Sequence, residues 1–203
     1  MKIQGLYTIV DNSLTPQYSH LWLAEQYLKG GARTLQLRDK KGPPPFETAR
    51  QIMALKKNYD FTFIVNDYLE VALEVKADGW HGGKDDLPII EARKLLGPER
   101  IIGYSSHSLE EALVAEQNGA DYVAFGAIFP TTTKQPGHPI QGLEKLHEVC
   151  RQVKVPVVAI GGIHRVNVDG VIQAGASAVA MISGLTKAKD IAEEVAWYVQ
   201  KIG

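Results

Sequence analysis

The chain has 203 residues, of which 45% are hydrophobic, and a formal net charge of −1. This length builds one sizeable core or two small ones, and the small net charge gives no indication of a nucleic-acid or membrane-surface partner. The first residues lack the apolar region of a signal peptide, and no apolar run approaches a membrane span. The single cysteine, Cys150, excludes an internal disulfide and is expected to be a buried small hydrophobe, so the sequence predicts a cytoplasmic protein.

Short apolar or β-branched runs alternate along the chain with amphipathic stretches of helical periodicity. Eight runs are predicted strands, over residues 6–10, 34–37, 61–65, 79–81, 100–104, 122–125, 157–160 and 178–181. Eight helices are predicted to follow them, over residues 21–29, 47–57, 68–75, 88–96, 109–118, 143–153, 166–174 and 190–201. The fifth helix begins with a capping box, in which Ser108 is followed three residues later by Glu111.

A weak internal repeat accompanies this alternation. Small residues mark the helix ends before predicted strands two, four, six and eight, at residues 30–32, 76–79, 119–121 and 175–177. Strands that alternate with helices indicate right-handed crossovers and a parallel sheet. We therefore predict an α/β fold, a single-domain (β/α)8 TIM barrel over residues 1–203. An open doubly wound sheet is the alternative, but its glycine-rich turn belongs after the first strand, whereas the glycine-rich turns here come late.

Polar side chains follow the second predicted strand, where a barrel would place its active site. Strand alternation points Gln36, Arg38 and Lys40 to one side. Buried parallel strands are otherwise rich in Val and Ile, so these residues indicate an anionic ligand. The alternative is that Arg38 and Lys40 are solvated charges at the rim, and for Lys40 this is about as plausible.

Carboxylates follow the third and fourth predicted strands, as Asp67 and as the pair Asp85 and Asp86. Neighbouring parallel strands bring such groups together, and Mg²⁺ commonly takes one or two carboxylates plus substrate phosphates. Each aspartate also has a purely structural interpretation. Asp67 forms a capping box with Glu70, and Asp85 and Asp86 precede a helix that could start at Pro88.

The loops after the fifth and sixth strands carry hydroxyl groups. Ser105 and Ser106 follow the fifth strand, and helix capping is the simpler interpretation for Ser106. His107 is interpreted as a structural hydrogen-bonding residue. The loop over residues 126–134 contains three threonines and Lys134, which suit an oxygen-rich anion, although a flexible polar loop would also explain the threonines.

Glycines follow the seventh strand, at Gly161 and Gly162, and Ser183 and Gly184 follow the eighth. Loops after these two strands often bind phosphate through backbone N–H groups, although the glycines could merely form tight turns. Two anion-binding regions are thus predicted on one face. A metal-dependent region contains Asp67, Asp86, Arg38, Lys40 and Lys134, and a metal-free region is formed by backbone at Gly162 and Ser183. A substrate pair with a diphosphate and a monophosphate would fill both.

Six segments, in order over nearly the whole chain, resemble the motif series of the thiamine phosphate synthase family. They are QLRDK at 36–40, VND at 65–67, ADGWHGGKDDLP at 77–88, IGYSSHS at 102–108, FPTTTK at 129–134 and AIGGI at 159–163. The resemblance implies a transferase of thiamine biosynthesis. Such an enzyme joins 4-amino-2-methyl-5-hydroxymethylpyrimidine diphosphate to 4-methyl-5-(2-hydroxyethyl)thiazole phosphate and releases diphosphate. An electron-rich pyrimidine allows a dissociative path without an enzyme nucleophile.

The resemblance also implies roles for single residues. The pyrimidine diphosphate would be bound by Gln36, Arg38, Lys40, Asn66, Ser105 and Lys134. The thiazole phosphate would be bound by Thr131, Thr133, Gly162, Ile182 and Ser183. Mg²⁺ would be held by Asp67 and Asp86, which selects Asp86 over Asp85. The residues expected to act in catalysis are Arg38, Lys40, Ser105 and Lys134.

The chain departs from the family pattern at several positions, of which Lys84 and Ala127 matter most. Lys84 stands where the family commonly has Gln and could pair with Asp85 or Asp86 or contact the diphosphate. Some segments also resemble the sister family of thiazole tautomerases, whose isomerisation depends on a histidine at the position of Ala127. Ala127 therefore counts against a tautomerase, which is kept as an alternative together with a non-catalytic phosphate-binding barrel.

Aromatic residues on two predicted helices, Trp22, Trp197 and Tyr198, suggest a contact between copies in a homo-oligomer. Packing within the outer ring of helices explains them equally well.

Overall fold

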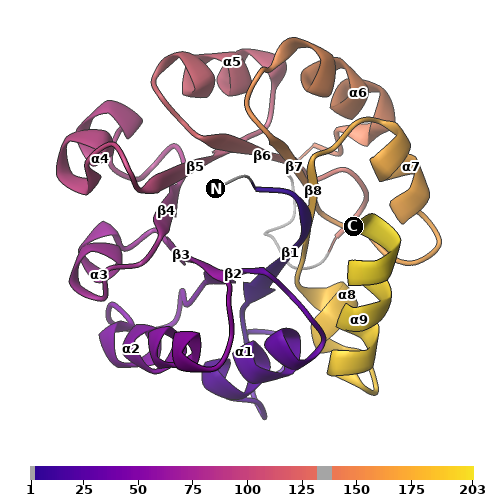
Figure 1. The fold of residues 1–203 in the computed structure, drawn as a ribbon. Coiled ribbons are helices and arrows are strands. Elements are labelled where there is room, and N and C mark those ends of the chain that lie inside the picture. The colour runs from indigo at the N-terminus through magenta and orange to yellow at the C-terminus, as the bar shows by residue number, and fades with distance from the viewer. Residues whose placement is uncertain (1–2, 132–138) are drawn as a thin grey trace.

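The computed structural model describes residues 3–131 and 139–203. Eight parallel strands pair in chain order and close into a barrel through the pairing of the first strand with the last. Figure 1 shows the closed ring of strands with the helices around its outside. The strands are β1 (Gly5–Val10), β2 (Thr34–Leu37), β3 (Thr62–Asn66), β4 (Gly79–Gly82), β5 (Ile101–Ser106), β6 (Tyr122–Gly126), β7 (Val157–Ile160) and β8 (Ala178–Met181). The predicted (β/α)8 barrel is confirmed.

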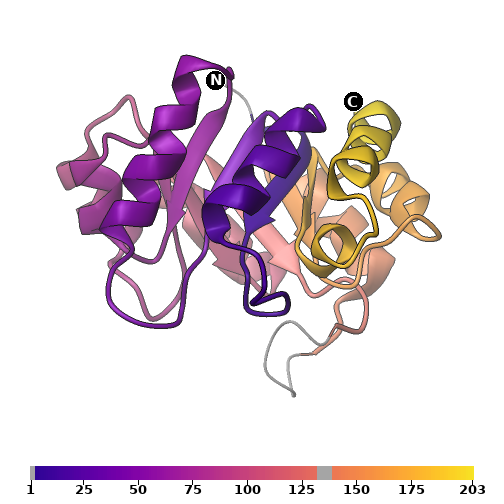
Figure 2. The same cartoon turned by 90° about the horizontal axis from the view of Figure 1, so that it is seen from below.

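The helices return outside the barrel between successive strands (Figure 2). They are α1 (His20–Lys29), α2 (Phe46–Ala54), continued by the 3₁₀ helix η1 (Leu55–Lys57), α3 (Leu69–Glu74), α4 (Ile89–Leu96), α5 (Leu109–Gln117), α6 (Gly142–Gln152), α7 (Val168–Gln173), α8 (Ser183–Thr186) and α9 (Ile191–Ile202). The predicted strands and helices agree with these bounds to within two residues. The sequence missed α8, because four residues are too few to show helical periodicity.

Two apolar cores lie on opposite sides of the sheet, because successive side chains of a strand point to opposite faces. The inner core fills the barrel and includes Tyr7, Ile64, Ile101, Tyr122 and Val158. The outer core lies between the strands and the helices and is larger. Side chains that face inward near the carboxyl end of each strand therefore form the top of the inner core and the floor of any pocket at that end of the barrel.

Helix ends explain several of the motifs read from the sequence. The Ser108 side chain accepts a hydrogen bond from Glu111 N at 3.1 Å, which confirms the predicted cap of α5. His107 lies beside it, with its backbone N–H donating to the Glu111 carboxylate and its ring 3.4 Å from that carboxylate. The structural role expected for His107 agrees with these contacts.

The outer helices also hold the cysteine and the aromatic residues noted above. Cys150 on α6 is half-buried, and burial raises the pKa of its thiol to about 11. Tyr198 is buried, and the Arg165 guanidinium lies 4.5 Å from the centre of the Trp197 ring. Trp22 stacks on Tyr18 with ring centres 4.2 Å apart. These contacts lie within one chain, so the homo-oligomer stays a prediction.

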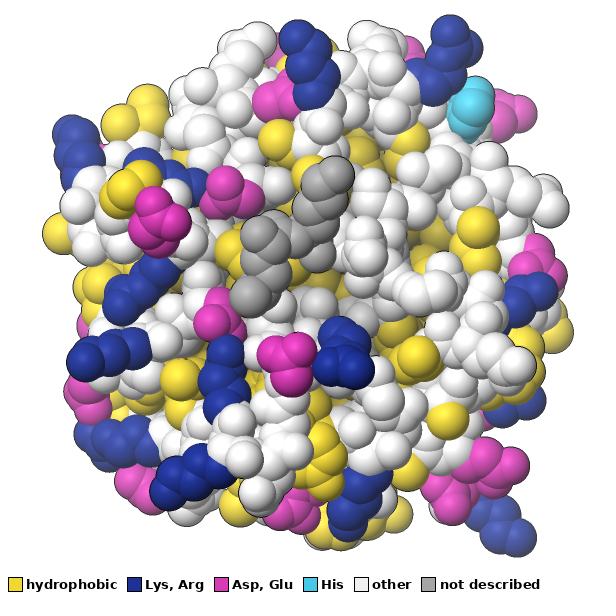
Figure 3. All heavy atoms as spheres, viewed as in Figure 1, with side chains coloured by type: hydrophobic (Ala, Val, Ile, Leu, Met, Phe, Trp, Pro, Cys, Tyr) yellow, Lys and Arg dark blue, Asp and Glu magenta, His cyan; other side chains and the backbone are white. Residues whose placement is uncertain are grey.

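The described helices include none that is long and apolar enough to cross a membrane. On the face shown in Figure 3, basic and acidic side chains are interspersed, in keeping with the net charge of −1. This face therefore carries charges of both signs rather than a field of one sign.

Candidate active site

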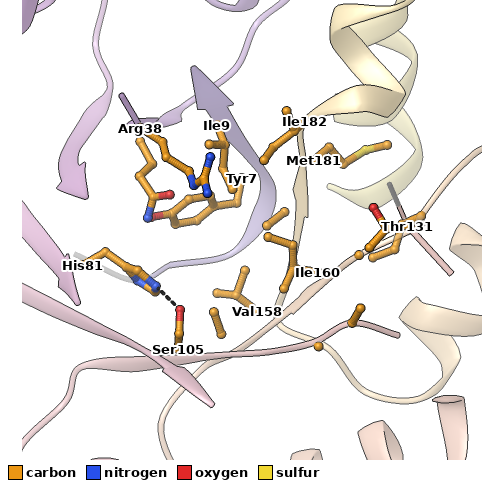
Figure 4. A pocket seen from close by; sticks show the side chains of 18 of the residues that line it. Tyr7, Ile9, Arg38, His81, Ser105, Thr131, Val158, Ile160, Met181 and Ile182 are labelled. Carbon is orange, nitrogen blue, oxygen red and sulfur yellow. Dashed lines mark hydrogen bonds between the residues drawn. The ribbon is translucent and has the colours of Figure 1, made fainter. Parts of the chain in front are cut away.

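A pocket opens at the carboxyl ends of the strands, and every one of the eight strands contributes to its wall. Figure 4 shows the side chains that converge on it. Ile9, Val158 and Ile160 supply apolar surface to the pocket, while Arg38, His81 and Ser105 supply polar groups. An apolar pocket with a few convergent polar groups is the expected form of a small-molecule site.

Arg38 is held at the mouth of β2 by a carboxylate from the neighbouring strand. Its backbone N–H donates to Val10 O at 3.0 Å, and its guanidinium donates to the Asp11 carboxylate. The Asp11 side chain is 3% exposed and also accepts a hydrogen bond from Ser13 N at 2.8 Å. Burial tends to raise the pKa of Asp11, but the hydrogen bonds from Ser13 and the charge of Arg38 outweigh burial and hold that pKa below its ordinary value. Asp11 is therefore ionised at neutral pH and orients Arg38.

Lys40 reaches across to the next strand and forms an ion pair with Asp67 at 3.1 Å. Asp67 has a φ of 63°, in the left-handed region. Its backbone is fixed by β4, since Asp67 N donates to His81 O at 2.9 Å and the Trp80 ring N–H donates to Asp67 O at 2.9 Å. The capping box predicted for Asp67 is wrong, because α3 starts after Tyr68 and has no side-chain cap. The Asp67 carboxylate instead faces Lys40.

Asp86 lies near this ion pair, and Asp85 does not share its environment. The Asp86 carboxylate is partly buried and accepts a hydrogen bond from Gly83 N at 2.8 Å. Burial raises the pKa of Asp86, and the negative charge of nearby Asp67 adds to this effect. Asp85 and Lys84 are both exposed. The alternative that these aspartates merely cap α4 is wrong, since that helix has no side-chain cap.

The carboxylates suit a hard cation. The negative charge of Asp67 helps to raise the pKa of Asp86, so the two carboxylates lie near enough to interact. Within the described residues, no group of three or more His, Cys, Asp or Glu side chains gathers as it would around a fully protein-held metal. Mg²⁺ needs only one or two carboxylates when phosphates and water complete its shell. The donor set therefore fits Mg²⁺ bound together with a phosphate-bearing ligand.

A chain of hydrogen bonds crosses the floor of the pocket. Gln36 Nε2 donates to Tyr7 OH at 3.1 Å, and Tyr7 OH lies 2.7 Å from Tyr122 OH. Tyr122 OH lies 2.9 Å from His81 Nδ1, and His81 Nε2 lies 2.9 Å from Ser105 Oγ, the bond drawn in Figure 4. Gln36 and Ser105 were predicted from the sequence as site residues, but the three aromatic residues between them were not. Inward alternation along β1, β4 and β6 was the one signal that pointed to these three.

The loops after β7 and β8 line the other side of the pocket, where Gly162, Ile182 and Ser183 lie with Thr131. Gly162 has a φ of 64°, and a Cβ atom there would lie 2.4 Å from Pro130 O. Only glycine therefore allows this close approach between the loop after β7 and the loop after β6, which contains Pro130. Gly162 both forms a tight turn and lines the pocket, so a turn-forming role and a role in a phosphate-binding loop do not exclude each other.

The comparisons with known proteins agree over most of the chain. A family model described as thiamine monophosphate synthase matches residues 6–185. The chain belongs to the thiamine monophosphate synthase family. It is 46% identical over 193 residues to the thiamine-phosphate synthase of Shouchella clausii, covering 94% of this chain and 92% of that protein. It is also 46% identical over 190 residues to that of Moorella thermoacetica, covering 92% and 90%.

A solved structure of a family member shows the same fold. The thiamine phosphate pyrophosphorylase from Pyrococcus furiosus superposes with a TM-score of 0.86 at 39% identity, covering 98% of this chain and 96% of that one. The resemblance to the thiamine phosphate synthase family drawn from the motifs is confirmed.

The structure brings most of the residues expected from the family motifs to one place. Those that line the pocket are Gln36, Arg38, Asn66, Ser105, Thr131, Gly162, Ile182 and Ser183. Lys40, Asp67 and Asp86 form a charged group whose Asp67 directly follows the pocket residue Asn66. Thr133 and Lys134 lie outside the described residues.

One polar residue of the pocket differs from its expected role. Ser106 was expected to cap a helix, but it lies within β5 and its hydroxyl donates to Ala124 O at 3.1 Å.

Lys40 is 54% exposed although it is paired with Asp67, so it combines the two interpretations of a rim charge and a site residue.

Proposed function

We propose that this chain condenses 4-amino-2-methyl-5-hydroxymethylpyrimidine diphosphate with 4-methyl-5-(2-hydroxyethyl)thiazole phosphate to give thiamine phosphate and diphosphate. The observation that carries the proposal is that one pocket is lined by Arg38, with Lys40 paired to Asp67 next to the pocket residue Asn66, and by the loops after β7 and β8. Relatives of nearly full coverage bear the name thiamine-phosphate synthase. A substrate with a diphosphate and one with a monophosphate match this arrangement.

Arg38 and Lys40 are proposed to bind the diphosphate. Arg38 donates in a planar fork that matches phosphate oxygens, while Lys40 adds a point charge. Asp67 and Asp86 would hold Mg²⁺, which when bound supplies positive charge to the diphosphate as it leaves. Groups placed before the reaction stabilise charge that develops in the transition state more than they stabilise the ground state.

The proposed reaction is dissociative. The bond between the pyrimidine methylene carbon and the diphosphate oxygen breaks, and its electron pair leaves with the diphosphate. The aminopyrimidine carries the positive charge until the thiazole nitrogen attacks the methylene carbon. The apolar wall of Ile9, Val158 and Ile160 keeps water from the cation. This path requires no enzyme nucleophile, and Cys150, whose pKa is raised to about 11, lies on α6 in the outer layer.

The phosphate of the thiazole is proposed to bind at Gly162 and Ser183, with Ile182 and Thr131 against its ring. Backbone N–H groups at glycine-rich loops after the last strands are a frequent phosphate site in such barrels. Thr133 and Lys134 are proposed from the motif match alone. Asn66 and Ser105 are proposed to bind the pyrimidine half, on the side of the pocket nearer Gln36.

The tautomerase alternative is weakened by Ala127. This residue is buried and lines the pocket, where its methyl group carries no proton for an isomerisation. Arg38, which lines the pocket, and Lys40, which is paired with Asp67 beside it, are cationic side chains that suit a diphosphate. These groups favour a catalytic synthase over both alternatives.

The test is to mix the two substrates with Mg²⁺ and to quantify thiamine phosphate and diphosphate. We expect equal amounts of both products, and no products when EDTA removes the metal. The absence of both products under all metal conditions, with isomerisation of a carboxylated thiazole phosphate instead, would replace the synthase by the tautomerase. Release of diphosphate without thiamine phosphate would indicate hydrolysis rather than condensation.

A further inference from the structure

The pocket floor contains polar groups that have no role in the proposed reaction. Tyr7 is 2% exposed, Tyr122 is fully buried and His81 is 5% exposed. Burial raises the pKa of both tyrosines, so both hydroxyls stay protonated at neutral pH. Buried polar atoms are costly unless they are hydrogen-bonded. We call the chain of Gln36, Tyr7, Tyr122, His81 and Ser105 the relay.

The relay has one direction when it is followed from Gln36. An amide nitrogen donates and does not accept, so Tyr7 oxygen accepts from Gln36 Nε2. Among the described residues, the partners of Tyr7 OH are Gln36 and Tyr122, so the Tyr7 proton points to Tyr122. Tyr122 must then donate to His81 Nδ1. His81 therefore carries its proton on Nε2, which donates to Ser105 Oγ.

The two ends of the relay face the pocket with opposite character. The Ser105 oxygen accepts from His81, so the Ser105 hydroxyl proton is left to donate to a ligand. Gln36 commits its amide nitrogen to Tyr7, so its Oε1 is left to accept from a ligand. Both residues line the pocket. A heteroaromatic ring with an exocyclic amino group and a ring nitrogen lone pair complements this donor and acceptor.

The Tyr122 ring fits inside the barrel because the facing position on β5 is a glycine, which has no side chain. Gly103 on β5 faces the Tyr122 ring, and a Cβ atom there would lie 2.1 Å from Tyr122 Cζ. The His81 and Tyr122 rings stack with centres 5.5 Å apart. Tyr122 is thus held in place by packing as well as by its hydrogen bonds to Tyr7 and His81, so its hydroxyl cannot easily turn to another partner.

We propose that Tyr7, Tyr122 and His81 are positioning residues that fix the His81 tautomer and thereby make Ser105 a donor and Gln36 an acceptor for the pyrimidine ring. The inference rests on the proposed function for the identity of the ring. It goes further in assigning a specificity role: a 4-amino group is accepted, while a 4-oxo ring, whose adjacent nitrogen carries a proton, presents the reversed pattern. A site built for one pattern rejects the other because buried groups are left unpaired.

The first test needs no substrate. Long-range ¹H–¹⁵N correlation spectra of the full chain with labelled histidine report which ring nitrogen carries the proton, and His81→Gln identifies the His81 signals among those of six histidines. We expect a protonated Nε2 and an unprotonated Nδ1. A proton on Nδ1, or on both nitrogens, would overturn the inference. This measurement stands whether or not the chain makes thiamine phosphate.

The second test measures binding without turnover. Dissociation constants of the 4-amino pyrimidine diphosphate and its 4-oxo analogue are compared in wild type and in Tyr122→Phe, with the thiazole phosphate omitted. We expect wild type to prefer the amino compound, and Tyr122→Phe to lower this preference by about 10- to 100-fold, with a mixed His81 tautomer. Tyr7→Phe should act in the same direction.

Tyr198→Phe is the matched control, because Tyr198 is an equally buried tyrosine in the outer layer. It should leave the amino-to-oxo preference unchanged. Equal weakening of both analogues by Tyr122→Phe, or an equal change in the control, would show a merely structural role and refute the inference. Failure of wild type to form product in the condensation assay would refute the proposed function alone, since the tautomer is measured separately.

Discussion

Replacement of Asp11 by Asn tests whether a buried carboxylate holds Arg38 in place. The substitution keeps the shape and an oxygen for Ser13 N but removes the negative charge opposite the Arg38 guanidinium. The Asp11 side chain is 3% exposed and that of Arg38 is 20% exposed. Breaking a fully buried pair costs about 3–5 kcal/mol, but water reaches Arg38 and the hydrogen bond from Ser13 survives. A loss of about 2 kcal/mol, as for a hydrogen bond to a charged group, is therefore expected.

The free energy of unfolding from urea titrations at pH 7 measures this loss. For a chain of this size it corresponds to a decrease in Tm of about 4–8 °C. Asp60→Asn is the control, since Asp60 pairs with Arg33 at side-chain exposures of 96% and 73% and should lose less than about 1 kcal/mol. A double-mutant cycle with Arg38→Gln isolates the coupling between the Asp11 and Arg38 side chains.

The dependence on pH has a definite sign. The pKa of Asp11 is lowered in the folded protein, so its contribution is present above the unfolded carboxyl pKa and is lost as the pH falls through the folded value. The difference between wild type and Asp11→Asn should therefore shrink as the pH falls from about 5 toward 3. We also expect the KM for the pyrimidine diphosphate to rise about tenfold, with that for the thiazole phosphate unchanged. A loss no larger than that of Asp60→Asn would refute the argument.

Three other changes test separate parts of the site. Asp86→Ala should abolish Mg²⁺-dependent condensation because it loosens the metal. Asp85→Ala, at an exposed position, should keep most of the activity. Equal losses of activity in the two variants would contradict the assignment of Asp86 as the metal ligand. Gly162→Ala should raise the KM for the thiazole phosphate at least tenfold, because the alanine Cβ would lie 2.4 Å from Pro130 O. An unchanged KM would exclude the loop after β7 from the phosphate site. Cys150, with a pKa of about 11, should react with iodoacetamide at pH 8 far more slowly in the folded than in the urea-unfolded chain, and equal rates by mass spectrometry would contradict its burial.

The barrel was predictable because its signals are local. Strand and helix periodicity placed each predicted element within two residues. The recurrence of small residues at four helix ends supported the count of eight units, and the late position of the glycine-rich turns favoured a closed barrel. Alternation along β2 placed Gln36 and Arg38 on the inner face, where both line the pocket. These inferences need only the side-chain period of a strand and the order of the elements.

The remaining features depend on register and backbone conformation. The hydrogen bond between His81 and Tyr122 joins residues 41 positions apart, so it follows only from the pairing of β4, β5 and β6. Asp67 has the spacing of a helix cap, but its φ of 63° and its ion pair with Lys40 turn the carboxylate to another use. Likewise, the choice between Asp85 and Asp86 came from the motif match, and the unequal burial of the two side chains agrees with it.

The hydrogen bond between Tyr7 and Tyr122 also has a consequence for how the protein folds. These residues are 115 positions apart, so the pocket floor cannot form until β6 has joined the strands before it. Long-range pairings of this kind require the entropy of a large loop to be lost first, and they slow folding. During synthesis, a chain shorter than 122 residues would hold a partial sheet without the relay. The tautomer of His81 is therefore also a spectroscopic marker that distinguishes an assembled barrel from a compact but incomplete one.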